Sequence, residues 1–197
     1  MADSAKNIRA FLAIEPSEDV LQAMVRLQEK LKREISGKIS WTRPQGQHLT
    51  LKFFGDISTE DANNISAAVQ NRVAGFPLNL KIEKLGVFPN ARKPRVLWCG
   101  TSGDVEKLIH LQKQLDGDFA GIGFPEEERP FRAHLTLGRI KDSHGLIGIS
   151  EALNKHSAFI AGEFTCNELI LFQSKLTPQG AIYTRLATFP QKADRIV

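Results

Sequence analysis

Cysteine is scarce in this sequence. The 197 residues include only two, Cys99 and Cys166, and both lie in apolar segments that are typical of strands. A disulfide framework or a cysteine-ligated zinc site needs more cysteines at characteristic spacings. We therefore expect both thiols to be buried as small apolar side chains, in a protein of a reducing compartment.

Long apolar runs are also missing. The longest is Ala10–Ile14, far shorter than the ~20 residues that a membrane-spanning helix requires. The first residues do not combine a charged segment, an apolar segment and a small-residue cleavage site. The sequence therefore predicts a cytoplasmic protein with no membrane contact, and a monomer is the default expectation for its oligomeric state.

The sequence contains no glycine-rich phosphate-binding loop of either common type. It is 42% hydrophobic and 24% charged, which is typical of a globular protein. The net charge of +4 permits an anionic partner, but many basic proteins bind no nucleic acid. The positions of the basic residues are therefore more informative than their sum.

The hydrophobic pattern predicts interleaved strands and helices. Several strands are separated only by short turns, which favours antiparallel pairing and an α+β fold over a doubly wound parallel sheet. The second half repeats the order of the first, so residues 1–197 are predicted to form one domain of two similar lobes. The predicted strands are Asn7–Ile14, His48–Phe54, Leu78–Phe88, Arg95–Gly100, Ala133–Ile140, Gly162–Leu176 and Gly180–Phe189; helices are predicted after Ser17 and Ser58, and over Asp104–Phe119 and Ile149–His156.

One tetrapeptide, His-Leu-Thr-Leu, occurs twice. The copies are His48–Leu51 and His134–Leu137, and each follows a loop that contains arginine and proline. A single His-x-Thr in a strand is more often a solvent-facing pair than a functional site. Two copies with matching context favour a functional role, and they indicate a weak internal repeat.

Strand geometry gives this repeat a chemical meaning. Side chains alternate across a strand, so each copy presents its leucines to one face and its histidine and threonine to the other. If the two lobes face each other, two imidazoles and two hydroxyls meet in one cleft. One imidazole can accept a proton from water and the other can donate a proton to a leaving oxygen, because the ordinary pKa of histidine is near working pH. The hydroxyls of Thr50 and Thr136 can donate hydrogen bonds to phosphate oxygens. This scheme requires no metal and no cofactor.

Other residues near the motifs are candidates for substrate binding. Arg43 and Arg132 lie in the loops before the two histidines and can attract an RNA backbone. Phe11 and Phe53 can each stack on a base. Strand alternation places Arg139 and Phe53 on the leucine face, so we expect Phe53 to pack in the core and Arg139 to lie at a sheet edge or pair with an acid.

The chain resembles the 2H phosphoesterases, specifically the RNA 2′,3′-cyclic phosphodiesterases of the LigT/ThpR type. The likeness covers nearly the whole chain; it rests on both motifs with their flanks, on Arg9–Ile14, Trp41–Pro44 and Pro94–Trp98, and on Ser174–Pro178 with Gly180 and Tyr183. It implies a bilobal α+β fold in which two mainly antiparallel sheets line a central cleft, with helices outside. The family usually has proline before the second histidine, whereas this chain has Ala133, a change that removes no catalytic group.

The resemblance also implies roles. His48 would be the proton donor, His134 the proton acceptor, and Thr50 and Thr136 would hold the phosphate. The implied substrate is RNA with a 2′,3′-cyclic phosphate end, which includes tRNA fragments, and the implied product carries a 2′-phosphate.

The alternatives are a 2′–5′ RNA ligase that joins tRNA halves, a phosphodiesterase for small cyclic nucleotides, and a non-catalytic RNA-binding module of the same fold.

Overall fold

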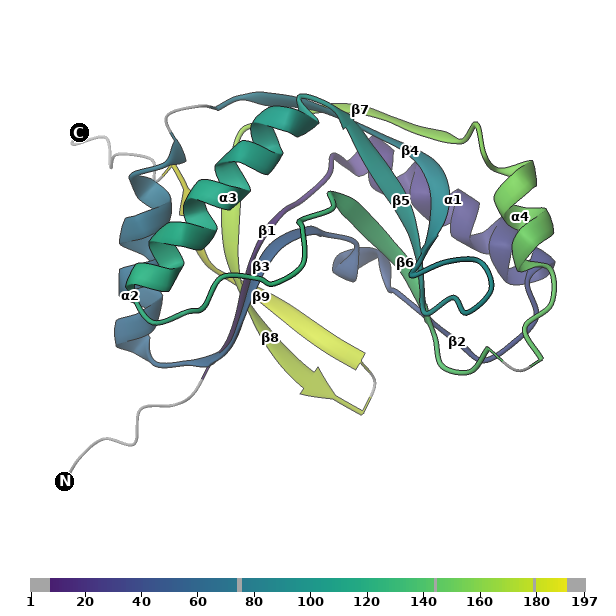
Figure 1. Cartoon of the computed structure of the whole chain (residues 1–197), viewed down its shortest axis with the longest axis horizontal. Helices are drawn as coiled ribbons and strands as arrows, with labels where there is room; N and C mark the ends of the chain where they lie inside the picture. Colours follow the sequence, from purple (N-terminus) through teal and green to yellow (C-terminus); the bar gives the residue numbers. More distant parts are fainter. Residues whose placement is uncertain (1–7, 74–75, 144, 179, 191–197) are drawn as a thin grey trace.

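The computed structural model describes residues 8–73, 76–143, 145–178 and 180–190. Helices and strands are interleaved along the chain, as the hydrophobic pattern predicts (Figure 1). In chain order the elements are β1 (Ile8–Ile14), α1 (Glu18–Glu34), β2 (Ile39–Trp41), the 3₁₀ turn η1 (Pro44–Gly46), β3 (Leu49–Ile57), α2 (Thr59–Gln70), β4 (Leu78–Phe88), β5 (Val96–Gly103), α3 (Val105–Gly121), β6 (His134–Ile140), α4 (Ile149–Lys155), β7 (Ile160–Cys166), β8 (Leu169–Thr177) and β9 (Gly180–Phe189).

The sheet confirms the α+β class with antiparallel pairing. The strand order is β7-β4-β5-β6-β3-β1-β8-β9, and β2 pairs with β6 beside this path. The resemblance implied two sheets. The structure instead has one nine-stranded sheet, because hydrogen bonds connect all the described strands. The two halves of the sheet are connected by few hydrogen bonds. Strand β2 pairs with residues 138–140 of β6, and β3 pairs with β6 only through Leu49 and Leu135. The sheet therefore has two halves that meet at one residue pair.

One predicted strand, Gly162–Leu176, is wrong as a single element. The structure divides it into β7 and β8, with Asn167 and Glu168 between them. β7 pairs with β4 at one edge of the sheet, whereas β8 lies between β1 and β9 in the other half. The apolar pattern of a strand does not indicate which neighbouring strand it will pair with. The pattern alone therefore could not separate β7 from β8.

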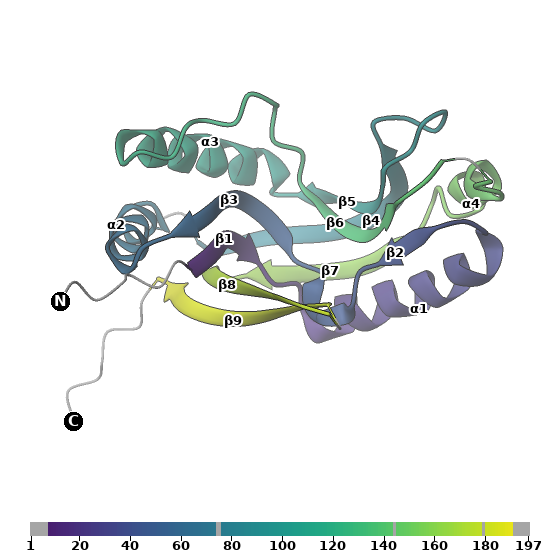
Figure 2. The ribbon, with the colours of Figure 1, turned by 90° about the horizontal axis from the view of Figure 1, so that it is seen from below.

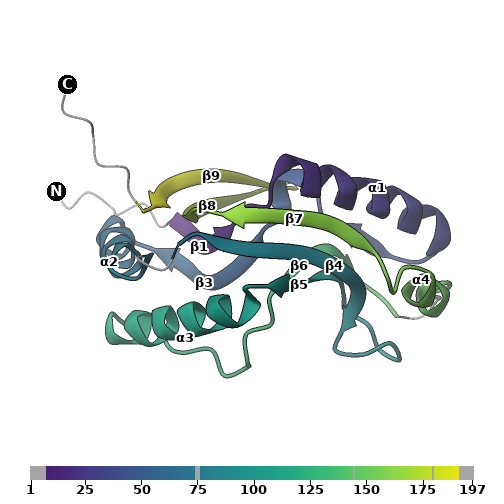
Figure 3. The same cartoon turned by 90° about the horizontal axis from the view of Figure 1, so that it is seen from above.

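The helices gather in two pairs at opposite ends of the long axis, with α2 and α3 at one end and α1 and α4 at the other (Figure 1). The views from below and from above place α3 on one side of the strands and α1 on the other (Figures 2 and 3). Helix α2 begins after Ser58 as predicted, where Ser58 and Asp61 exchange hydrogen bonds in a capping box.

The hydrophobic core explains why β1 is apolar on both faces. Ala10, Leu12 and Ile14 belong to the main core, whereas Phe11 and Ala13 belong to a second small cluster on the opposite face. The two cysteines are buried and free, as expected. Within the described part of the chain, no helix combines the length and the apolarity needed to cross a membrane.

Candidate active site

The two His-Leu-Thr-Leu motifs meet where the halves of the sheet join. Leu49 pairs with Leu135 in antiparallel register, and both leucines are buried in the core. Antiparallel register then sets His48 opposite Thr136 and Thr50 opposite His134, with all four side chains on the face away from the leucines. Opposed Cβ atoms in such a pair lie about 5 Å apart and diagonal neighbours about 7–8 Å apart. In this register the two histidines are diagonal neighbours.

A cavity of about 750 Å³ opens on this face. Three of the four motif side chains line it: His48, Thr50 and Thr136. His134 is not part of the cavity wall and reaches the same face through its register opposite Thr50. The wall also includes Arg9, Phe11, Arg43, Phe53, Arg139 and Tyr183.

Each motif ends in a β-bulge, and both bulges fall at the same motif position. Leu51 is skipped in the pairing of β3 with β1, and Leu137 is skipped in the pairing of β6 with β5. An extra residue reverses the alternation that follows it. Phe53 and Arg139 therefore lie on the motif face and line the cavity, and their expected placement on the leucine face is wrong.

His48 lies among aromatic rings and carries little exposed surface, 8%. Its ring centroid lies 4.7 Å from that of Phe172, 5.1 Å from that of Tyr183 and 5.6 Å from that of Phe11. Burial, together with the positive charge of Arg185, lowers the pKa of His48 to about 4. The imidazole is therefore neutral at pH 7 in the free protein.

His134 has a similar aromatic setting, 5.0 Å from Phe88 and 6.4 Å from Trp98 between ring centroids. Its Nδ1 lies 2.6 Å from the carbonyl oxygen of Arg132. A carbonyl oxygen only accepts, so Nδ1 carries the hydrogen, and Nε2 of the neutral ring is left as a proton acceptor. Burial lowers the pKa of His134; the hydrogen bond to Arg132 opposes this shift and the charge of Arg139 adds to it.

The three predicted binding residues lie in different surroundings. Arg43 lines the cavity, and its guanidinium group packs closely against Gly180. A Cβ atom placed on Gly180 would lie 3.3 Å from the guanidinium carbon. Arg132 lies outside the cavity wall, and its guanidinium carbon is 5.6 Å from the centre of the Phe88 ring. Phe11 lines the cavity but is only 3% exposed and stacks on Phe172, whereas Phe53 is 54% exposed. Phe53 thus offers a freer ring face than Phe11.

Comparison with known proteins identifies the family. A family model described as LigT like Phosphoesterase matches residues 14–98 and 101–183. The chain belongs to the LigT-like phosphoesterase family. This result confirms the resemblance that the two motifs suggested.

Curated relatives of this LigT-like phosphoesterase include several proteins named RNA 2′,3′-cyclic phosphodiesterase. The protein from Methanothermobacter thermautotrophicus is 34% identical over 183 residues, which cover 92% of this chain and 98% of the relative. The protein from Aquifex aeolicus is 34% identical over 186 residues, which cover 93% of this chain and 97% of the relative.

Solved structures show the same fold. A crystal structure of a Thermus thermophilus protein has a TM-score of 0.75 at 26% identity and covers 92% of this chain and 97% of its own. Escherichia coli LigT, solved as a complex with 3′-AMP, has a TM-score of 0.74 at 24% identity and covers 93% of this chain and 97% of its own.

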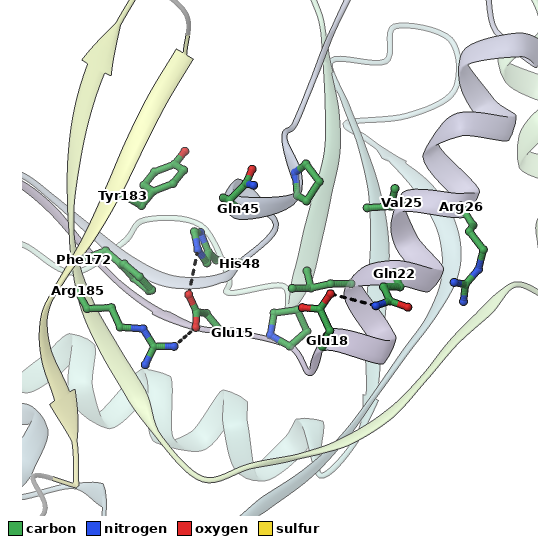
Figure 4. Close-up of a pocket in the computed structure, with 13 residues that line it drawn as sticks. Glu15, Glu18, Gln22, Val25, Arg26, Gln45, His48, Phe172, Tyr183 and Arg185 are labelled. Carbon is green, nitrogen blue, oxygen red and sulfur yellow. Dashed lines mark hydrogen bonds and ion pairs between the residues drawn. The ribbon is translucent and has the colours of Figure 1, made fainter.

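Sequence reasoning missed a second cavity of about 770 Å³ in this LigT-like phosphoesterase. His48 lines this cavity as well as the first. Glu15 lies between His48 and Arg185 in its wall, with Glu15 Oε1 3.8 Å from His48 Nε2 (Figure 4). Glu15 and Arg185 are 170 positions apart in the sequence, so no motif spacing could have paired them.

Among the residues that the structure describes, no group of three histidine, cysteine, aspartate or glutamate side chains is arranged to hold a metal ion.

Proposed function

We propose that this LigT-like phosphoesterase hydrolyses the 2′,3′-cyclic phosphate at an RNA end to a 2′-phosphate, by acid–base catalysis without a metal ion. The observation that carries the proposal is the antiparallel pairing of the two motifs, which gathers two imidazoles and two hydroxyls on one face. The shared name of the curated relatives supports the substrate class.

In this mechanism His134 is the base and His48 is the acid. Nε2 of His134 takes a proton from water while the water oxygen forms a bond to phosphorus. The bond from phosphorus to the ribose O3′ breaks, and His48 gives its proton to O3′. The products are a 2′-phosphate and a free 3′-hydroxyl; His134 ends protonated and His48 neutral, so both are restored by proton exchange with solvent.

The hydrogen bond from His134 Nδ1 to the Arg132 carbonyl supports this assignment, because it leaves Nε2 as the acceptor. Thr50 and Thr136 donate hydrogen bonds to the non-bridging phosphate oxygens as negative charge develops there. His48 must be protonated to act, although its pKa is about 4 in the free protein. The negative charge of a bound phosphodiester favours the imidazolium and raises the pKa of His48 on binding.

RNA beyond the phosphate would follow the cavity wall. Arg43 and Arg139 are placed to neutralise backbone phosphates, and the exposed ring of Phe53 provides a surface for an unpaired base. Arg132 acts at least through its carbonyl oxygen, which orients His134. A direct contact between the Arg132 guanidinium and RNA stays a prediction.

The deciding experiment is an assay on an oligonucleotide that ends in a 2′,3′-cyclic phosphate, with EDTA present. Formation of a 2′-phosphate end supports the proposal. A 3′-phosphate product would reverse the identity of the leaving oxygen, and a strict metal requirement would overturn the mechanism. Addition of an RNA with a 5′-hydroxyl tests 2′–5′ ligation of tRNA halves, and binding without turnover would identify a non-catalytic RNA-binding module.

A further inference from the structure

A cluster of charged side chains lies beside His48 in the second cavity. Glu15 contacts the His48 ring through one carboxylate oxygen and forms an ion pair with Arg185 through the other. Figure 4 shows the ion pair of Glu15 with Arg185. Arg185 forms a second ion pair with Glu168, in which Nη1 lies 3.1 Å from Oε1. Two carboxylates thus share one guanidinium, and the group carries one net negative charge while His48 is neutral.

A protonated His48 would balance this charge. An opposite charge within about 4–6 Å favours the charged form of a titrating group, and a like charge disfavours it. Glu15 therefore favours the proton on His48 and Arg185 opposes it. Because His48 lines both cavities, it can take up a proton from water in the second cavity while RNA occupies the first.

We propose that Glu15 is a positioning residue that orients His48 and holds its proton, and that Arg185 limits the strength of this effect by neutralising part of the Glu15 charge. This inference rests on the proposed role of His48 as the acid. It assigns the second cavity the function of supplying a proton to His48 while RNA is bound, on the side away from the phosphate.

Other groups around His48 do not replace Glu15 in this role. Glu18 lines the second cavity but accepts a hydrogen bond from Gln22, and the ion pair of His48 is with Glu15 instead. The charged and titratable side chains that line the two cavities with His48 are Glu15 and Arg9 from β1 and its end, Glu18 and Arg26 from α1, Arg43 before η1, Arg139 from β6, and Tyr183 and Arg185 from β9. Of the carboxylates in this set, Glu15 is the one with an ion-pair distance to the imidazole.

The test compares two substitutions that break the same ion pair from opposite sides. The pKa of His48 is measured by NMR titration of labelled histidine in the free protein, and kcat/KM is measured against pH on the cyclic-phosphate oligonucleotide. Glu15→Gln removes a negative charge and should lower the pKa of His48; Arg185→Gln removes a positive charge and should raise it. If the pKa of His48 differs by one unit between two variants, the fraction of protonated His48 differs about tenfold at a pH above both pKa values.

A purely structural ion pair would respond differently, because both substitutions lose the same contact. Shifts of the same sign, or none, would overturn the proposal. Glu15→Asp keeps the charge and should restore much of the pKa, with kcat changed more than KM because Glu15 lies outside the phosphate cavity. Glu18→Gln is the matched control in the same cavity and should leave the pKa of His48 and the rate as they are.

The outcome separates this inference from the proposed function. If His48→Ala retains turnover, the acid assignment fails and the role of Glu15 fails with it. If His48→Ala is inactive while Glu15→Gln and Arg185→Gln shift the His48 pKa in one direction, the proposed function stands and only the role of Glu15 is wrong.

Discussion

Leu49 and Leu135 form the one residue pair through which β3 and β6 join, within the described part of the sheet. Each leucine stands between the histidine and the threonine of its motif, so this single pairing sets the geometry of all four polar side chains. A shift by one residue would move one motif to the core face. The site therefore depends on the core packing of two leucines that do not touch substrate.

Replacing either motif histidine should abolish most of the activity. General acid and general base catalysis each contribute on the order of 10²- to 10⁴-fold, so we expect His48→Ala and His134→Ala each to lower kcat by an amount in that range. RNA affinity should change much less. The control is His110→Ala on the exposed face of α3, which should behave as the unaltered protein. Near-normal turnover by either motif variant would refute the acid–base mechanism.

The two threonines should act through their hydroxyls. Thr50→Val and Thr136→Val preserve shape but remove the donor, and loss of one donor to a developing oxyanion costs about 10² in rate. Thr50→Ser and Thr136→Ser retain the hydroxyl and should keep most of the activity. Near-normal kcat in the valine variants would show that the hydrogen bonds do not contribute to catalysis.

The pH dependence of kcat/KM should be bell-shaped with its maximum below pH 6.5. This parameter reports the free enzyme, in which burial lowers the pKa of both His48 and His134 below the ordinary value. The profile of kcat should lie at higher pH, because the bound anion favours both imidazolium forms. The two apparent pKa values belong to the pair of histidines. A kcat/KM maximum at pH 7 or above would contradict the burial of the two rings.

Breaking the buried ion pair of Lys52 and Asp116 should destabilise the fold strongly. Lys52 Nζ lies 2.5 Å from Asp116 Oδ1 and 2.5 Å from the carbonyl oxygen of Pro125, and the Lys52 side chain is 4% exposed. Lys52→Met leaves a buried carboxylate without its partner, and we expect a loss of about 3 kcal/mol in the free energy of unfolding, measured with urea. Arg72→Gln breaks the exposed pair with Asp118 and should cost clearly less. If Lys52→Met and Arg72→Gln lost equal free energy of unfolding, burial would not increase the cost of breaking the Lys52 ion pair.

The sequence predicted most elements because local patterns carry them. The capping residue Ser58 and the apolar spacing of α3 identified helices close to their observed bounds. Placement of individual side chains failed where the pattern is interrupted. Phe53 and Arg139 were assigned to the wrong face because a bulge depends on which residue of the neighbouring strand is left unpaired, and that information lies elsewhere in the chain.

What the sequence determined by itself is the chemical inventory: two histidines, two threonines and the leucines that orient them, repeated 86 positions apart and held in strands whose side chains alternate. The tertiary structure alone decided that Leu49 faces Leu135, that Phe53 and Arg139 line the cavity, and that Glu15 lies between His48 and Arg185. The physical reason is the range of the forces involved. Alternation follows from the backbone of one strand, whereas strand pairing, bulges and ion pairs form between segments that only the folded core brings together.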